Sequence, residues 1–320
     1  MSTNRNSEEK LNLHVRNKNR TQYDLEAMAV SVPELKNYIQ PNKLGANSLN
    51  FSDPNAVKTL NKTILNYYYG IEYWEFPKEN LCPPIPGRAE YIHHLADLLS
   101  ENNANGIPTG KGVKCLDIGT GASCIYPILG VTEYEWDFIA SDIDPKSIKS
   151  AQNIVDSNPS LKGKVSCRIQ KNPQFIFRGI IEKGERIDLT LCNPPFHSSI
   201  EEALKGTRRK VKNLTGKKAV QPKLNFSGNI NELVYEGGEI QFIANMISES
   251  KEFAKSCFWF SVLVSKEANL KKIYKLLNEN APSEIRTIKV KTGNKSSNIV
   301  AWTFLTATER RLWQEDKRTN

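Results

Sequence analysis

The chain has 320 residues, 39% of them hydrophobic and 25% charged, which is ordinary for a globular protein and argues against global disorder. Its 44 Lys and Arg against 35 Asp and Glu give a net charge of +9, which favours contact with a polyanion without identifying one. No apolar run approaches the ~20 residues that cross a bilayer and no secretory signal begins the chain, so we expect a soluble, cytoplasmic protein with one large catalytic domain.

The N-terminal stretch, residues 1–20, is polar and predicts a basic, flexible arm. Arg16, Lys18 and Arg20 near its end are candidate contacts to RNA phosphates. A solvated tail without a ligand would have the same composition, so that alternative stays open.

Residues 21–105 predict an N-terminal helical module. Asp53 is placed to cap a helix, because apolar residues recur every three or four positions between 56 and 65. The segment 82–88 contains three prolines and is expected to be non-helical, whereas residues 89–99 predict a helix. The stretch 102–110, rich in asparagine and glycine, is the expected linker to the next domain.

Over residues 106–310, short apolar runs alternate with helical patterns, which predicts an α/β domain built on a mostly parallel sheet. Several of the six cysteines lie in these runs and none forms a C-x-x-C pair, so we expect buried reduced thiols and no metal site. The last two of seven strands form an antiparallel hairpin across residues 293–297, which is typical of methyltransferases. The expected strands are 113–118, 138–141, 165–168, 187–192, 257–264, 285–291 and 299–305, and the expected helices are 146–157, 239–255 and 266–278.

The first strand of this domain runs into a glycine-rich turn that contains Gly119 and Gly121, where a ligand can approach the backbone. A dinucleotide-binding turn would carry a third glycine where Cys124 stands, and the carboxylate of Asp117 would repel a pyrophosphate. The cationic methionine end of S-adenosyl-L-methionine suits that carboxylate better. Asp142, at the tip of the next strand, is placed to accept from the ribose hydroxyls, unless it caps the following helix, for which Asp144 is the better candidate.

The segment Asn193-Pro194-Pro195-Phe196 follows an apolar strand at the same edge of the sheet. An adenine amine is a poor nucleophile, and accepting both of its N–H bonds localises the lone pair toward the methyl donor. Asn193 offers an amide oxygen and Pro194 a carbonyl for this, while the prolines stiffen the turn and Phe196 offers a face for the base. No strong base is required, so His197 is interpreted as a bystander.

A basic insertion follows Phe196, within a predicted substrate loop over residues 197–235. It contains no acid between Ala203 and Asn231, which fits a loop that grips phosphates, although a solvated loop would have similar composition. Its candidate RNA contacts are Lys205, Arg208, Arg209, Lys210, Lys212, Lys217 and Lys218.

These motifs together resemble the RlmF family, bacterial 23S ribosomal RNA adenine-N6 methyltransferases, and their eukaryotic relatives that act on small nuclear and messenger RNA. The resemblance is carried by the segments 50–54, 81–88, 91–95, 117–127 and 193–196 and spans most of residues 14–305. The proline-rich segment that ends in Arg88 and the turn that ends in Ser123-Cys124 are narrower signatures than the tetrapeptide.

The resemblance implies a class I S-adenosylmethionine-dependent methyltransferase with a Rossmann-like sheet, acting on one adenine of 23S rRNA, adenine 1618 in the family's nomenclature. It also implies cofactor contacts for Arg88, Gly119, Ser123, Asp142, Asn172 and Asn193. The expected partner is 23S rRNA or a large-subunit assembly intermediate, and we expect a monomer. Bacterial ribosomal enzymes fit better than the eukaryotic relatives, because the chain has no long C-terminal extension after Trp313.

Three alternatives remain on the residues alone. The acceptor could be a glutamine amide or a DNA adenine, since the same hydrogen bonds activate any planar amine. An RNA-binding module that holds the cofactor without turnover is opposed by the intact Asn193 and Phe196. A dinucleotide oxidoreductase is opposed by the missing third glycine.

Overall fold

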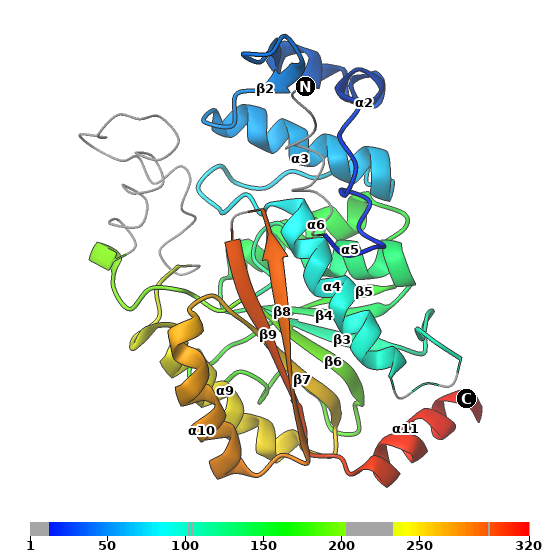
Figure 1. Cartoon of the computed structure of the whole chain (residues 1–320). Helices are drawn as coiled ribbons and strands as arrows, with labels where there is room; N and C mark the ends of the chain where they lie inside the picture. Colours follow the sequence, from blue (N-terminus) through cyan, green and yellow to red (C-terminus); the bar gives the residue numbers. More distant parts are fainter. Residues whose placement is uncertain (1–12, 102, 104, 203–232, 294, 320) are drawn as a thin grey trace, which may run out of the picture.

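A seven-stranded sheet runs through the computed structural model (Figure 1), which describes residues 13–101, 103, 105–202, 233–293 and 295–319. The strand order is β5-β4-β3-β6-β7-β9-β8, and β9 alone runs antiparallel to the other six. The predicted α/β fold with a C-terminal antiparallel hairpin is confirmed, and it is the fold of class I methyltransferases. The strands are β3 (Lys114–Ile118), β4 (Asp137–Asp142), β5 (Val165–Ile169), β6 (Ile187–Cys192), β7 (Cys257–Val264), β8 (Glu284–Thr292) and β9 (Lys295–Thr303).

Helices cover both faces of this sheet, because its strands are apolar on both sides. Side chains alternate between the faces: Cys115 packs on one side, and Leu116 and Ile118 pack on the other. The first face carries α4 (Ile85–Ser100), α5 (Ile125–Tyr134) and α6 (Pro145–Ser157), and the second carries α9 (Gly238–Ser250) and α10 (Leu270–Asn280).

Shorter elements complete the described chain. At the N-terminal end they are α2 (Leu25–Ser31), η1 (Pro33–Tyr38), β1 (Ile39–Pro41), β2 (Asn47–Leu49) and α3 (Pro54–Tyr69). Later in the chain they are η3 (Lys251–Phe253), η4 (Glu267–Asn269) and α11 (Ala307–Thr319). In Figure 1, α2 and α3 stand above the sheet and α11 lies below it.

The predicted cap of α3 is present, because a carboxylate oxygen of Asp53 accepts from the backbone N–H of Asn55 at 2.9 Å. Gly70 ends α3 in the left-handed conformation with φ 67°. No helix in the described part of the chain is long and apolar enough to cross a membrane.

The prediction that residues 82–88 are non-helical is wrong for their second half. Helix α4 begins at Ile85 and includes Pro86, Gly87 and Arg88 in its first turn. Proline is tolerated there because the N–H groups of a first helical turn have no partner within the helix. The hairpin connection is also shorter than predicted, since β8 and β9 pair as far as Thr292 and Lys295.

The predicted flexible arm has to be shortened. Residues 13–20 pack against α4, and Asn17 and Asn19 are 3% and 1% exposed. Glu90 of α4 accepts from the backbone N–H of His14 and from the Asn17 side chain. Residues 1–12 of the arm lie outside the described residues. The prediction erred because a polar segment can pack when a buried carboxylate receives its donors.

Candidate functional site

A cavity of about 220 Å³ opens at the carboxyl ends of β3, β4 and β6. This is the edge at which open α/β sheets bind ligands. Eight of the predicted site residues line it: Arg88, Gly119, Gly121, Ser123, Asp142, Asn193, Pro194 and Pro195. Asp117, Asn172 and Phe196 do not line it.

The glycine-rich turn after β3 is folded back onto the end of β4. The backbone N–H groups of Gly119 and Thr120 both donate to the carbonyl of Ser141 at 2.9 Å. Gly119 and Gly121 have φ of 73° and 64°, a conformation that side chains with a Cβ rarely adopt. Glycine is therefore required at both positions to bring the backbone to the cavity wall.

Asp142 is fixed at the cavity by two backbone donors. One carboxylate oxygen accepts from the N–H of Gly121 and the other from the N–H of Asp144, each at 2.9 Å. Asp144 is the cap of α6, because it accepts from the N–H of Lys146 at 3.1 Å and from the hydroxyl of Ser147 at 3.0 Å. The alternative in which Asp142 caps α6 is thus excluded, and Asp142 lines the cavity as predicted.

Asp117 lies beneath the turn and is fully buried. Neither of its carboxylate oxygens accepts a hydrogen bond from the described residues. Burial raises the pKa of Asp117 to about 7; Thr120 and Arg88 oppose this rise, and the charge of Asp142 adds to it. Asp117 therefore lies behind the cavity wall and changes its charge near neutral pH.

Arg88 reaches the cavity from the first turn of α4. Its Nη1 donates to the hydroxyl of Tyr126 on α5 at 2.7 Å, and the guanidinium carbon lies 5.4 Å from the centre of the same ring. Its Nε is buried and has no hydrogen-bond partner among the described residues. A cation held in this way can pair with a carboxylate that enters the cavity.

The end of β6 places Asn193. The hydroxyl of Tyr91 accepts from the N–H of Cys192 at 3.4 Å and lies 2.9 Å from the hydroxyl of Ser261 on β7, so the strand end is held from both sides. The side-chain oxygen of Asn193 is buried and accepts no hydrogen bond from any residue that the structure describes. A buried acceptor without a donor is costly, and an N–H of a ligand would satisfy it.

The aromatic wall of the cavity comes from residues that the sequence interpretation did not single out. Tyr235 and Phe242 line it with ring centres 5.2 Å apart, and the hydroxyl of Tyr235 accepts from the Asn245 amide at 2.8 Å. Phe196 is half-buried and outside the cavity. Tyr235 lies at the far end of the predicted loop, where no sequence motif marks it as a residue of the cavity.

Asn172 is in the expected loop but has a local role. Its side-chain oxygen accepts from the N–H of Gln174 at 3.0 Å. Its neighbours Gln170, Pro173 and Phe175 line the cavity instead. Asn172 therefore closes the turn that presents these neighbours to the cavity, and its predicted contact with the cofactor stays a prediction.

The predicted RNA contacts divide into two groups. Lys205, Arg208, Arg209, Lys210, Lys212, Lys217 and Lys218 lie outside the described residues. Both ends of the predicted loop are described and adjacent, since the N–H of His197 donates to the carbonyl of Leu233 and the N–H of Tyr235 donates to the carbonyl of His197, each at 3.0 Å. The loop therefore starts and ends at the cavity.

The cations of the N-terminal stretch make contacts within the protein. Arg16 donates to Asp97 at 2.6 Å and to the hydroxyl of Tyr134 at 2.8 Å, and Lys18 pairs with Glu133 at 3.1 Å. Arg20 is half-buried. Arg16 and Lys18 therefore hold the N-terminal segment against α4 and α5.

Comparison with known proteins agrees with this geometry. A family model described as RNA methyltransferase matches residues 7–306. Ribosomal RNA large subunit methyltransferase F of Cytophaga hutchinsonii is 51% identical over 301 residues, covering 94% of each chain, and that of Serratia proteamaculans is 49% identical over 311 residues, covering 97% of this chain and 93% of its own.

Solved structures of human METTL16 are similar to this chain over most of its length. The catalytic domain in complex with MAT2A 3′UTR hairpin 1 has a TM-score of 0.76 and 29% identity, covering 92% of this chain and 96% of its own. The N-terminal domain in complex with S-adenosylhomocysteine (SAH) has a TM-score of 0.71 and 28% identity, covering 92% and 99%.

Proposed function

The chain belongs to the RNA methyltransferase family that its residues 7–306 match, and on that premise we propose that it methylates the N6 amine of one adenine in 23S ribosomal RNA. The methyl donor is S-adenosylmethionine, and the products are N6-methyladenosine and S-adenosylhomocysteine. The relatives' name supports a large-subunit RNA substrate. That the target is the N6 amine of a single adenine is implied by the resemblance to the RlmF family.

The cavity fits the cofactor at three points. The unpaired Nε of Arg88 suits the carboxylate of the methionine part, and the carboxylate of Asp142 suits the ribose hydroxyls. The backbone of Gly119 and Gly121 allows close approach, because no Cβ projects from it. When bound, the cofactor supplies an electrophilic methyl group on a sulfonium.

The buried, unpaired oxygen of Asn193 is the observation that carries the proposed reaction. It accepts one N–H of the adenine amine, and the carbonyl of Pro194 accepts the other, so the nitrogen lone pair is oriented toward the methyl group. The amine loses its proton to water after it has become cationic, so no side chain has to act as a strong base.

Two further contacts belong to the proposal. Phe196 stacks on the base, which requires its ring to turn toward the cavity when a base enters, because it lies outside the cavity wall. The loop cations from Lys205 to Lys218 bind the phosphates around the target adenine. Neutralising them is expected to weaken RNA binding and flatten its salt dependence, while titration calorimetry still shows full cofactor binding.

The decisive experiment measures transfer of labelled methyl groups to precursor large-subunit RNA and to assembly intermediates, followed by nucleoside analysis. The wild-type chain should produce N6-methyladenosine, and Asn193→Ala should lower kcat by about 100-fold or more, as removal of one buried transition-state contact does. Asn55→Ala, an exposed asparagine at the start of α3, is the matched control. Equal yields from Asn193→Ala and wild type would overturn the proposal. Methylation of a DNA duplex in place of RNA would show that the acceptor is a DNA adenine.

A further inference from the structure

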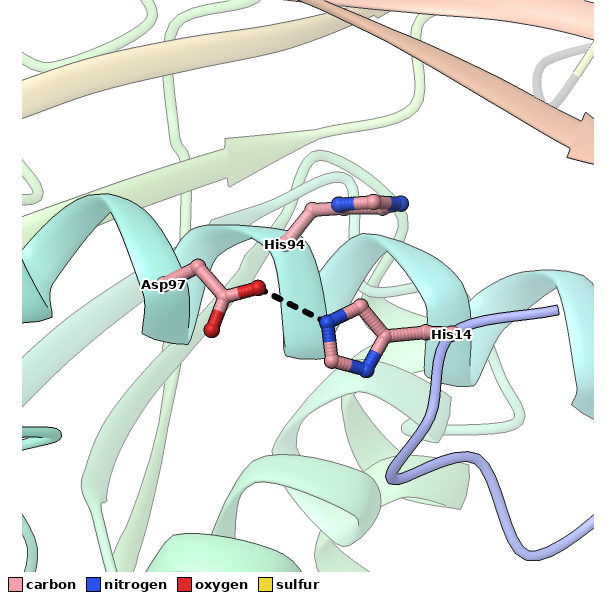
Figure 2. A group of neighbouring side chains, drawn as sticks. All are labelled: His14, His94 and Asp97. Atoms are coloured by element: carbon pink, nitrogen blue, oxygen red, sulfur yellow. Dashed lines mark hydrogen bonds and ion pairs between the residues drawn. The ribbon is translucent and has the colours of Figure 1, made fainter.

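Three of the chain's four histidines gather between α4 and the N-terminal segment 13–20. The rings of His14 and His93 are stacked with their centres 5.3 Å apart. The rings of His14 and His94 meet edge to face with their centres 5.1 Å apart. His14, His94 and Asp97 each offer one ligand atom, and these three atoms lie within 4.8 Å of one another. Figure 2 shows that His94 and Asp97 project from the same helix while His14 comes from the segment beside it.

We propose that His14, His94 and Asp97 bind one divalent transition-metal ion, for which Zn²⁺ is the best match, and that this ion fastens the N-terminal segment to α4. Two imidazole nitrogens and one carboxylate oxygen form a donor set that zinc accepts, and water fills the fourth tetrahedral position. None of the three residues lines the catalytic cavity, so the site is structural and separate from methyl transfer.

The distances are close to those of a metal site. The Nε2 of His14 and the Oδ2 of Asp97 are 2.7 Å apart, so two ligand atoms already face each other. The backbone N–H of Arg16 donates to the Nδ1 of His14 at 3.2 Å, so the neutral ring carries its proton on Nε2. When the ion binds Nε2, this proton moves to Nδ1, and the N–H of Arg16 releases that nitrogen. Zinc bonds of roughly 2.0–2.2 Å place tetrahedral ligand atoms roughly 3.3–3.5 Å apart. The three ligand atoms lie within 4.8 Å of one another, so a pair at that limit has to approach by about 1.3–1.5 Å, which the partly exposed Asp97 side chain and the His94 ring can supply.

The surroundings accommodate a cation although Arg16 is close. Arg16 donates to the Oδ1 of Asp97 at 2.6 Å, which leaves Oδ2 for the ion and orients the carboxylate. The same guanidinium also donates to the hydroxyl of Tyr134 and the carbonyl of His93, so three acceptors hold its position.

Glu90, one helical turn before His94, is 1% exposed and accepts from the backbone N–H of His14 at 2.8 Å. Its carboxylate supplies further negative charge beside the ligands and already holds the His14 segment in place.

The test is titration of the chelator-treated, full-length chain with Zn²⁺ by calorimetry, and with Co²⁺ by visible absorption, which distinguishes four-coordinate from six-coordinate ions. The wild-type chain should bind one ion, and His94→Ala should weaken the affinity by more than about 100-fold, because loss of a side chain that only supports a ligand already costs about 10–100-fold. His197→Ala is the matched control, because it removes the one histidine outside the cluster.

Folding is monitored separately. His94→Ala loses the 3.8 Å contact to Glu90 and the ring contact to His14, so the melting temperature of each variant in the presence of chelator is its own reference. Zinc should raise the melting temperature above that reference for wild type and not for His94→Ala. Equal affinity of His94→Ala and wild type, or a purely six-coordinate Co²⁺ spectrum, would show that the cluster is an ion-pair network and would overturn the proposal. Neither measurement depends on methyl transfer.

Discussion

At the scale of single residues, the cavity is marked by polar atoms that the described protein leaves unpaired. The Nε of Arg88 and the side-chain oxygen of Asn193 are both buried without a partner among the described residues. Each such group costs roughly 1–3 kcal/mol in a folded protein. The carboxylate of the cofactor at Arg88 and the amine of the adenine at Asn193 would offset these costs, which is why these two residues give the cavity its proposed specificity.

The Tyr126 hydroxyl should matter through Arg88. Tyr126→Phe removes the acceptor of the 2.7 Å hydrogen bond from Arg88 and keeps the buried ring. Since a hydrogen bond to a charged group contributes roughly 1.5 kcal/mol or more, the KM for S-adenosylmethionine should rise about tenfold with little change in kcat. Tyr134→Phe, on the same helix, contacts Arg16 and His93 instead and is the steady-state kinetic control. Identical KM values in both variants would contradict this role.

Asp117 should make the stability of the protein depend on pH. Its pKa is about 7 in the folded chain against an ordinary value of 3.8, so between these values the folded state holds a proton that the unfolded state has lost. The free energy of unfolding therefore falls as pH rises from about 4 to about 7 and is level above that range.

The variant Asp117→Asn removes this titration. Each pH unit within the window is equivalent to about 1.4 kcal/mol, so from about pH 5.5 to about pH 8 wild type should lose up to roughly 2 kcal/mol relative to Asp117→Asn. Urea denaturation at the two pH values measures the difference. A stability gap that stays constant with pH would mean that Asp117 is ionised throughout.

At the scale of elements, the sequence predicted strands better than helices. The bounds of β6 and β7 were predicted correctly because each is a mostly apolar run that is followed directly by a polar residue. Helix α5 was missed, since it is buried on nearly every side and shows no periodicity, and Pro127 and Gly130 lie within it. Helix α11 was missed because its polar face dominates a short segment.

The same limit applies to the site. Residues that follow a strand directly, such as Asp142 and Asn193, could be predicted because parallel strands end at one edge. Tyr235 and the His14–Asp97 pair could not, since no local pattern shows which residues fold back from 40 or more positions away along the chain. Arg88 came only from the resemblance, because its helix starts in a proline-rich segment.

Glu249 of α9 should control the loop that lines one side of the cavity. Its buried carboxylate accepts from three consecutive backbone N–H groups, those of Ile176, Phe177 and Arg178, at 2.8, 3.0 and 2.7 Å. Glu249→Gln replaces one acceptor oxygen with an amide that cannot accept, so the unfolding free energy should fall by about 2 kcal/mol and the KM for S-adenosylmethionine should rise severalfold.

The neighbouring exposed pair gives a control for that experiment. Glu252 pairs with the side chain of Arg178 at the surface, so Glu252→Gln should leave both the stability and the KM close to those of wild type. Thermal melting and steady-state kinetics distinguish the two variants. If Glu249→Gln lowered stability without affecting the KM, the loop would not depend on Glu249 for its position.

At the scale of the whole molecule, the two edges of the sheet have different tasks. The carboxyl edge carries the cavity, and the amino edge carries α11, which lies below the sheet in Figure 1. Asp188, near the start of β6, accepts from the backbone N–H of Lys114 at 2.7 Å and from the indole of Trp313 at 2.8 Å, and it pairs with Lys317. One buried carboxylate thus joins two strands and the last helix.

Trp313 should therefore be required for stability and dispensable for chemistry. Its ring is 5% exposed, packs against Phe258 with ring centres 5.8 Å apart and lies 4.0 Å beneath the guanidinium of Arg186. Trp313→Ala should lower the free energy of unfolding by about 3–5 kcal/mol, because it opens a cavity and leaves Asp188 without one of its donors. Leu312→Ala, at a neighbouring position that is 49% exposed, should change it by less than ~0.5 kcal/mol. Below the melting temperature, kcat and KM of Trp313→Ala should stay within about twofold of wild type, and a larger loss per folded molecule would mean that the two edges are coupled through the sheet.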